Sequence, residues 1–225
     1  MEKPSRLGTL DRVSIAGVAV FGALAVLLTT LSQAMGLNFP VIPYLQFDLG
    51  EIAILLAFFI FGPVPALVSS FIEFLTLMAI GQNVPIGPLF KLMAVISSLV
   101  GIWLGVAIVH RVQRPTLAKA SGVGTLLGIV FRAGLMSIPN FYLIVFLFSL
   151  QGTVGFLAAS FKLAGITLTN SNGLALILGL TAIFNGLQLL FVSIVSYMLV
   201  RLPQIARARA AGRPPWIMTY VNRGN

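Results

Sequence analysis

Side chains that could carry out covalent or acid–base chemistry are scarce in this chain of 225 residues. There is one histidine, His110, and no cysteine, which excludes thiol nucleophiles and thiolate metal sites. None of the four lysines follows a glycine, so the chain has no phosphate-binding P-loop. The five carboxylates lack the spacing of a metal site; they are Glu2, Asp11, Asp48, Glu51 and Glu73. We therefore expect neither an enzyme nor a metal centre.

The richest local concentration of functional groups is the loop at 38–48. It combines two prolines with three aromatic side chains, and Asp48 and Glu51 follow at a spacing that puts both on one face of a helix. Two carboxylates at the start of a helix either stabilise its positive end or contact a ligand. An ordered loop of this composition is typical of a binding surface.

The composition decides what kind of scaffold holds these groups. Hydrophobic residues make up 58% of the chain, charged residues 8%, and the mean hydropathy is +1.04. Long apolar runs without a polar face are typical of a polytopic membrane protein. We therefore predict an all-α integral membrane protein that forms a single membrane domain over 1–225.

The apolar runs predict six transmembrane helices. Counting about 20 residues per crossing, we place them near 13–35, 49–62, 63–80, 88–110, 120–148 and 173–201. The second and third meet at Gly62 and Pro63 and form a tight helical hairpin, because proline at the start of a helix needs no backbone donor.

Basic residues predict the orientation of the chain. They cluster before the first helix, between the fourth and fifth, and after the sixth, whereas the opposite loops contain only Lys162. The positive-inside rule then places both termini in the cytoplasm, with 202–225 as a basic cytoplasmic tail. The net charge of +9 is explained by orientation in the bilayer, and we expect no nucleic-acid binding. The clusters consist of Lys3, Arg6 and Arg12; Arg111, Arg114 and Lys119; and Arg201, Arg207, Arg209, Arg213 and Arg223.

Charged residues within the predicted spans need partners. Glu73 and Arg132 lie at similar depth in helices 63–80 and 120–148, and each charge costs about 2.5–3.5 kcal/mol at the centre of a membrane. We predict that they form a structural ion pair; a proton or substrate relay is the alternative. Lys91 begins helix 88–110 near the outer surface, where it either extends to water or faces an anionic ligand.

Amide side chains recur on the outer halves of the last two helices, and amides in an apolar setting must find partners. Asn140, Asn185 and Gln188 lie at the depth of the 38–48 loop. Hydrogen bonds between helices would satisfy them, but their coincidence with the loop favours one outward-facing pocket that orients a planar polar molecule. On the first helix, Ala19 and Ala23 form a small-residue step that permits close helix approach, either within the bundle or to a partner.

Several of these motifs together resemble the S components of energy-coupling factor (ECF) transporters, most closely the riboflavin-specific type. The loop Phe-Pro-Val-Ile-Pro-Tyr-Leu-Gln-Phe-Asp at 39–48, followed by Glu51 and Phe-Gly-Pro at 61–63, is similar to the family's first loop and second helix. The Ala19 to Ala23 step falls where that family has its alanine motif. Resemblance to the fifth and sixth helices of the riboflavin type is carried by Arg132, Met136, Asn140, Phe184 and Asn185.

The resemblance implies a substrate-capture subunit in the cell membrane of a prokaryote, without chemistry or a cofactor of its own. It would bind a vitamin from outside and deliver it inward together with a transmembrane coupling subunit and two ATPases. Ala19 and Ala23 would then contact the coupling subunit. The residues expected to contact the vitamin are Phe39, Tyr44, Leu45, Asp48, Lys91, Asn140, Asn185 and Gln188.

Gln188 departs from the riboflavin pattern, which usually has a lysine three positions after the asparagine. A glutamine can hydrogen-bond the edge of an isoalloxazine ring but supplies no charge, so another heterocyclic vitamin is the alternative substrate. The alternative functions are a self-sufficient proton-coupled carrier that uses Glu73 with Arg132, and a membrane scaffold without a ligand.

Overall fold

The computed structural model describes residues 8, 10–80, 84–112, 115–202 and 215–221. Within these ranges the regular structure is helical, as predicted, and five helices are long and apolar enough to cross a membrane. The chain is therefore a multi-pass helical membrane protein. Lys3, Arg6 and Arg114 lie outside the described residues, as does most of the tail predicted for 202–225.

Each of the six predicted spans corresponds to a helix, with ends shifted by up to six residues, and five of these six helices are long enough to cross a membrane. They are α1 (Arg12–Ala34), α2 (Gly50–Phe61), α3 (Pro63–Ile80), α4 (Ile86–Val112), α5 (Leu117–Tyr142) and α7 (Gly173–Val200). The exception in length is α2, whose 12 residues extend for only about 18 Å at 1.5 Å per residue. That is well short of a hydrocarbon core of about 30 Å, and α2 is buried on nearly all sides.

A further helix, α6 (Leu150–Leu163), was missed by the sequence analysis, which assigned no helix to 149–172. Pro139 lies within α5, and the chain then passes through a π-helical turn, η1 (Leu143–Leu147). A proline cannot donate to the preceding turn, and π turns commonly accommodate such a disruption. Ser149 adopts a φ of 60° and accepts a hydrogen bond from Gly152 N at 3.1 Å, which begins α6.

Part of the predicted tail is folded onto the bundle. Residues Trp216–Thr219 form a 3₁₀ turn, η3, in which Trp216 and Ile217 are buried. The Trp216 ring packs against Phe58 of α2 with centroids 5.1 Å apart, and His110 Nδ1 lies 3.0 Å from Tyr220 O. Aromatic side chains therefore anchor residues 215–221 to the bundle.

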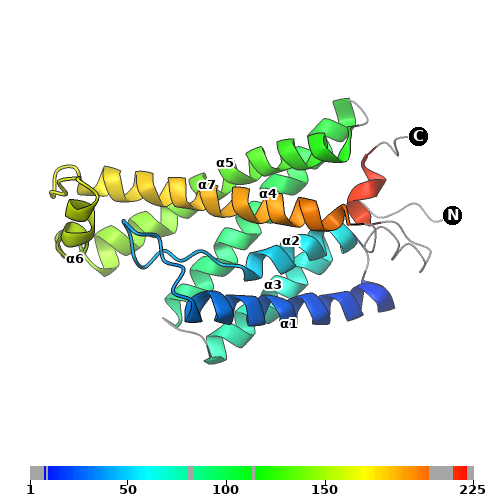
Figure 1. Cartoon of the computed structure of the whole chain (residues 1–225), viewed down its shortest axis with the longest axis horizontal. Coiled ribbons are helices and arrows are strands. Elements are labelled where there is room, and N and C mark those ends of the chain that lie inside the picture. The colour runs from blue at the N-terminus through cyan, green and yellow to red at the C-terminus, as the bar shows by residue number, and fades with distance from the viewer. Residues whose placement is uncertain (1–7, 9, 81–83, 113–114, 203–214, 222–225) are drawn as a thin grey trace.

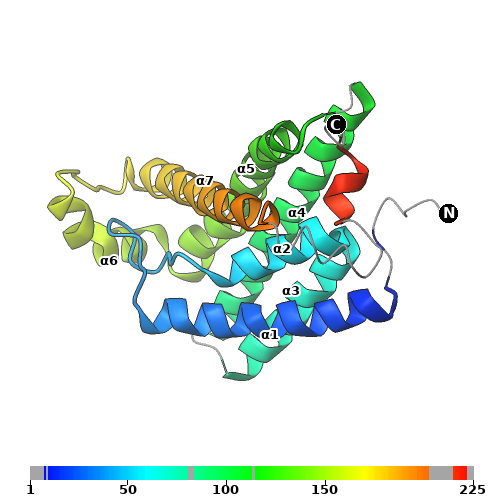
Figure 2. The ribbon, with the colours of Figure 1, turned by 45° about the vertical axis from the view of Figure 1, so that its right-hand side comes forward.

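α1 and α7 run roughly along the long axis, α3 and α4 cross it obliquely, and α2 lies inside the bundle (Figures 1 and 2). The start of α1, the end of α7 and η3 lie at one end, and the loop between α1 and α2 lies at the other, beside α6. The described basic residues at helix ends, Arg12, Arg111, Lys119 and Arg201, belong to the first of these ends. This is the distribution that the positive-inside rule describes.

Two separate hydrophobic cores hold the molecule together. The larger surrounds α2, whose buried side chains contact α1, α4, α7 and η3. The smaller lies at the loop end and joins Ile42 of the loop to Ile144 of η1, Leu157 and Phe161 of α6, and Ile177 of α7. The loop and α6 are therefore packed together by apolar contacts that are separate from those around α2.

A close helix contact joins α4 to α5 through glycines spaced four residues apart on both helices. A Cβ added to Gly101 would lie 2.6 Å from Gly128 Cα, and one added to Gly105 would lie 2.6 Å from Gly124 Cα. Small residues let two backbones approach in this way within a membrane. The close approach places α5, with Arg132, against α4, with Lys91.

We expect Gly105→Ala to destabilise the protein, because its methyl group meets backbone atoms that cannot move aside. Overpacking of this kind typically costs about 1–3 kcal/mol. The matched control is Gly122→Ala on α5, where an added Cβ meets nothing within 4 Å. Thermal unfolding in detergent should show a lower midpoint for Gly105→Ala alone; equal midpoints would contradict the assigned α4–α5 contact.

Candidate functional site

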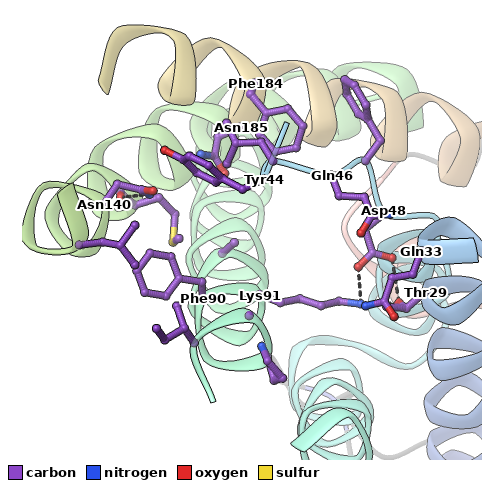
Figure 3. Close-up of a pocket in the computed structure, with 18 of the residues that line it drawn as sticks. Thr29, Gln33, Tyr44, Gln46, Asp48, Phe90, Lys91, Asn140, Phe184 and Asn185 are labelled. Atoms are coloured by element: carbon purple, nitrogen blue, oxygen red, sulfur yellow. Dashed lines mark hydrogen bonds and ion pairs between the residues drawn. The ribbon is translucent and has the colours of Figure 1, made fainter. Parts of the chain in front are cut away.

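A cavity of about 810 Å³ lies at the loop end of the bundle. Its walls come from the loop between α1 and α2 and from α1, α4, α5, α6 and α7 (Figure 3). The volume falls within the usual range of small-molecule sites, about 300–1,000 Å³. Six of the eight residues predicted to contact a ligand line it: Tyr44, Leu45, Asp48, Lys91, Asn140 and Asn185.

The other two predicted contacts, Phe39 and Gln188, are not among the lining residues and lie behind the cavity wall. Gln188 is 1% exposed, and its amide is used by the backbone of Asp48, donating to Asp48 O at 2.7 Å and accepting from Asp48 N at 3.3 Å. The Phe39 ring packs against Phe47 and Phe184, at centroid distances of 6.5 and 5.6 Å. Both residues support the wall and do not line the cavity.

The loop that forms this wall is folded back on itself. Phe39 N donates to Leu45 O at 2.7 Å and Phe47 N donates to Leu37 O at 2.8 Å. Gln46 Nε2 ties the loop to α1 by donating to Ser32 O at 3.0 Å. The predicted ordered loop is confirmed.

The start of α2 is built into the bundle by polar contacts. Leu49 N donates to Ser32 Oγ at 2.9 Å, and Gly50 N donates to Asp48 Oδ1 at 2.7 Å. A Cβ on Gly50 would lie 2.1 Å from Thr29 Oγ1, so glycine is required for the contact with α1. The first turn of α2 therefore lies deep in the protein, and the N–H groups of Leu49 and Gly50 find partners there.

Lys91 reaches from α4 across the cavity toward Asp48 and Thr29 (Figure 3). Its ammonium forms ion pairs with Asp48 Oδ2 and with Glu73 Oε1, the latter at 2.6 Å, and it also contacts Thr29 Oγ1. The Thr29 hydroxyl lies 2.8 Å from both Asp48 Oδ1 and Glu73 Oε1, so its one proton can serve either carboxylate. Lys91 therefore joins the loop to α3 and α1. Of the two predicted alternatives, it does not extend to water, and the anions that it faces are carboxylates of the protein itself.

Arg132 pairs with Glu51, and the predicted pair between Glu73 and Arg132 is therefore wrong. Its Nη1 and Nη2 donate to the two oxygens of Glu51 at 2.5 and 2.9 Å, and its Nε donates to Asn185 Oδ1 at 2.9 Å. Glu73 is bound to Lys91 instead. Arg132 and Glu51 are both buried, at 3% and 6% exposure.

Aromatic side chains make up much of the remaining wall. Phe47 and Phe184 lie 5.0 Å apart between ring centroids, and Phe90 and Phe148 line the cavity from α4 and the turn after η1. Burial raises the pKa of the Tyr44 phenol to about 12, so its hydroxyl remains a hydrogen-bond donor at physiological pH. Aromatic faces beside a few fixed polar groups suit a planar ligand.

The sequence analysis missed several lining residues. Phe148, Thr153 and Phe156 belong to the segment around α6, whose short mixed sequence carries no strong helical signal. Gln33 also lines the cavity, on the last turn of α1. Its position one turn after Thr29 on the same helix is a signal that could have identified it.

The described residues contain no group of three histidine, cysteine or acidic side chains that could hold a metal ion. The fold and site together define a multi-pass helical membrane protein with a ligand-sized cavity at one end, walled by aromatic, amide and internally paired charged groups. Comparisons with protein families, with curated proteins and with solved structures found no match to this chain.

Removing Arg132 should destabilise the ligand-free protein strongly, because Glu51 would remain buried without a counter-ion. Breaking a buried pair by removing one partner costs about 3–5 kcal/mol, whereas replacing both partners by apolar residues can be nearly neutral. We expect Arg132→Met to unfold well below the parent protein and the double variant Arg132→Met with Glu51→Leu to recover most of the loss. A double variant less stable than the single one would show that the two side chains do not act as a pair.

Proposed function

We propose that this protein is the substrate-capture subunit of an ECF-type vitamin transporter, which binds riboflavin or a related flavin from outside the cell membrane of a prokaryote. A transmembrane coupling subunit and two ATPases would supply the energy for delivery. The observation that carries the proposal is the cavity beneath the folded loop, because six of the eight residues predicted to contact the vitamin converge on it.

The chemistry of the cavity supports a flavin. Aromatic side chains from the loop, α4 and α7 can stack on a tricyclic ring, and the amides of Asn140 and Asn185 can orient its polar edge. Asn140 Nδ2 donates to Met136 O at 2.7 Å, which holds the amide in place and leaves acceptor capacity on its oxygen.

The surface of α1 supports a partner in the membrane. Ala19 and Ala23 are both exposed, so the bundle itself does not use the small-residue step, whereas Val18 and Gly22 of the same helix face inward. An exposed strip of small side chains allows another helix to approach closely. This is the contact proposed for the coupling subunit.

The first experiment is to purify the protein in detergent from cells grown in rich medium, record its visible spectrum and titrate the stripped protein with riboflavin. We expect a bound flavin at one per chain. Asn140→Leu should weaken binding about tenfold, the equivalent of one lost hydrogen bond of about 1.4 kcal/mol.

Ser137→Ala is the matched control for that variant. Its hydroxyl also donates to the carbonyl four residues earlier, at 2.7 Å, but Ser137 is not among the lining residues. Equal losses in the two variants would indicate a general effect on α5. A folded protein that binds neither flavin nor another vitamin would overturn the proposed function.

Large side chains on α1 should separate binding from transport. We expect Ala19→Trp with Ala23→Trp to abolish uptake in cells that contain the coupling subunit and ATPases, while riboflavin affinity of the purified variant stays unchanged. Ala118→Trp, at an exposed alanine of α5, is the control and should transport normally. Normal uptake by the α1 variant would rule out this surface as the coupling contact.

A self-sufficient proton-coupled carrier is the second candidate, favoured by two carboxylates that share Lys91 within the bundle. Uptake assays in cells without the coupling subunit or ATPases distinguish the two. Uptake that persists there and stops when the proton gradient is dissipated would establish the carrier.

A further inference from the structure

The cavity has charged walls but offers no unpaired positive charge. Among the described residues that line it, the cations are Lys91 and Arg132. Lys91 contacts two carboxylates, Asp48 and Glu73, and Arg132 is held by both oxygens of Glu51. Each cation is therefore already paired with a carboxylate before any ligand arrives.

The balance of this ionic group is negative. Three carboxylates surround two cations, which leaves a formal charge of minus one when all five groups are ionised. Three of its members are sheltered from water, since Glu73, Arg132 and Glu51 are 2%, 3% and 6% exposed, and the side chains of Lys91 and Asp48 are 14% exposed where they meet the cavity. Charges in such a setting are weakly screened and act strongly on a nearby ligand.

An anionic ligand would meet a double cost in this cavity. If it bound Lys91 or Arg132, it would displace a carboxylate that then stays buried without a partner, which is strongly unfavourable. If it left the pairs intact, it would lose its hydration beside a group whose formal charge is minus one, with no cation free to compensate. A neutral molecule avoids both costs, and a cationic one is attracted to the group.

We propose that the cavity selects uncharged or cationic heterocycles and rejects those that carry a carboxylate or phosphate. The other polar lining groups suit such a ligand, since the Tyr44 hydroxyl and the amides of Gln33, Gln46 and Asn140 are neutral. This inference rests on the proposed function and narrows it: a neutral flavin is accepted, whereas its phosphate ester is excluded by charge.

Matched pairs of ligands test the inference. The purified, stripped protein is titrated with riboflavin and riboflavin 5′-phosphate, which share a ring and differ in one charged group, and with nicotinamide and nicotinate, pyridoxine and pyridoxine phosphate, and thiamine and thiamine phosphate. The neutral or cationic member of whichever pair binds should bind at least about tenfold more tightly than the anionic one.

The outcomes separate this inference from the proposed function. Binding of nicotinamide, pyridoxine or thiamine over its anionic partner, without flavin binding, supports the charge rule and removes the flavin proposal. An anionic member that binds as tightly as its partner overturns the charge rule, even if the protein proves to be a flavin-capture subunit. Absence of binding in every pair counts against both.

A change of charge in the ionic group provides a second readout. Glu73→Gln removes one negative charge and keeps an oxygen that can accept from Lys91 and Thr29, so the preference for riboflavin over its phosphate should fall several-fold. Asp48→Asn also removes one negative charge, at the end of the loop. It replaces Glu73→Gln in the experiment if that variant does not fold. An unchanged ratio in a folded variant contradicts the inference.

Asp11→Asn is the matched control for these variants. It removes a carboxylate at the start of α1, where Asp11 Oδ1 accepts from Ser14 N at 2.9 Å, and asparagine can make the same cap. This position lies at the opposite end of the bundle from the loop (Figure 1), so the ratio should not change.

Discussion

The structure depends on a helix that begins inside the bundle. α2 is too short to cross a membrane, so its first turn must be satisfied by protein groups, because lipid offers no hydrogen bonds. Ser32 and Gln188 bind the backbone just before Gly50, and the carboxylates of Asp48 and Glu51 bring in Lys91 and Arg132 from α4 and α5. The same contacts that allow α2 to begin there therefore place two ion pairs in the wall of the cavity.

The cavity lies between two cores with different roles. The core around α2 is continuous with the close α4–α5 contact and fixes the positions of the charged residues. The smaller core joins the loop to η1, α6 and the start of α7, and these segments contribute much of the aromatic wall. Buried ionic contacts therefore position one side of the cavity, and the apolar packing of the loop against η1, α6 and α7 positions the other.

The sequence predicted the helices well because long apolar runs have few alternatives in a bilayer. It also predicted that the loop, Asn140 and Asn185 would meet, since position along a helix gives depth. It did not give rotation about the helix axis, which is why Glu73 was paired with Arg132 instead of Lys91. α6 and η3 were missed because their contacts are made by tertiary packing of short segments, and the position of Gln188 behind the wall depends on a loop conformation that no local pattern encodes.

The anchored aromatic turn at η3 gives the protein an optical reporter far from its cavity. The chain has two tryptophans, Trp103 and Trp216, and neither lines the cavity. Trp216 rests on Phe58, which lies seven residues along α2 from Glu51, so one rigid helix connects the ionic wall to the indole ring. With a ligand that does not absorb where tryptophan emits, a change in emission would register a change around Trp103 or Trp216 and not contact with the ligand itself; a flavin would also quench the emission directly by energy transfer.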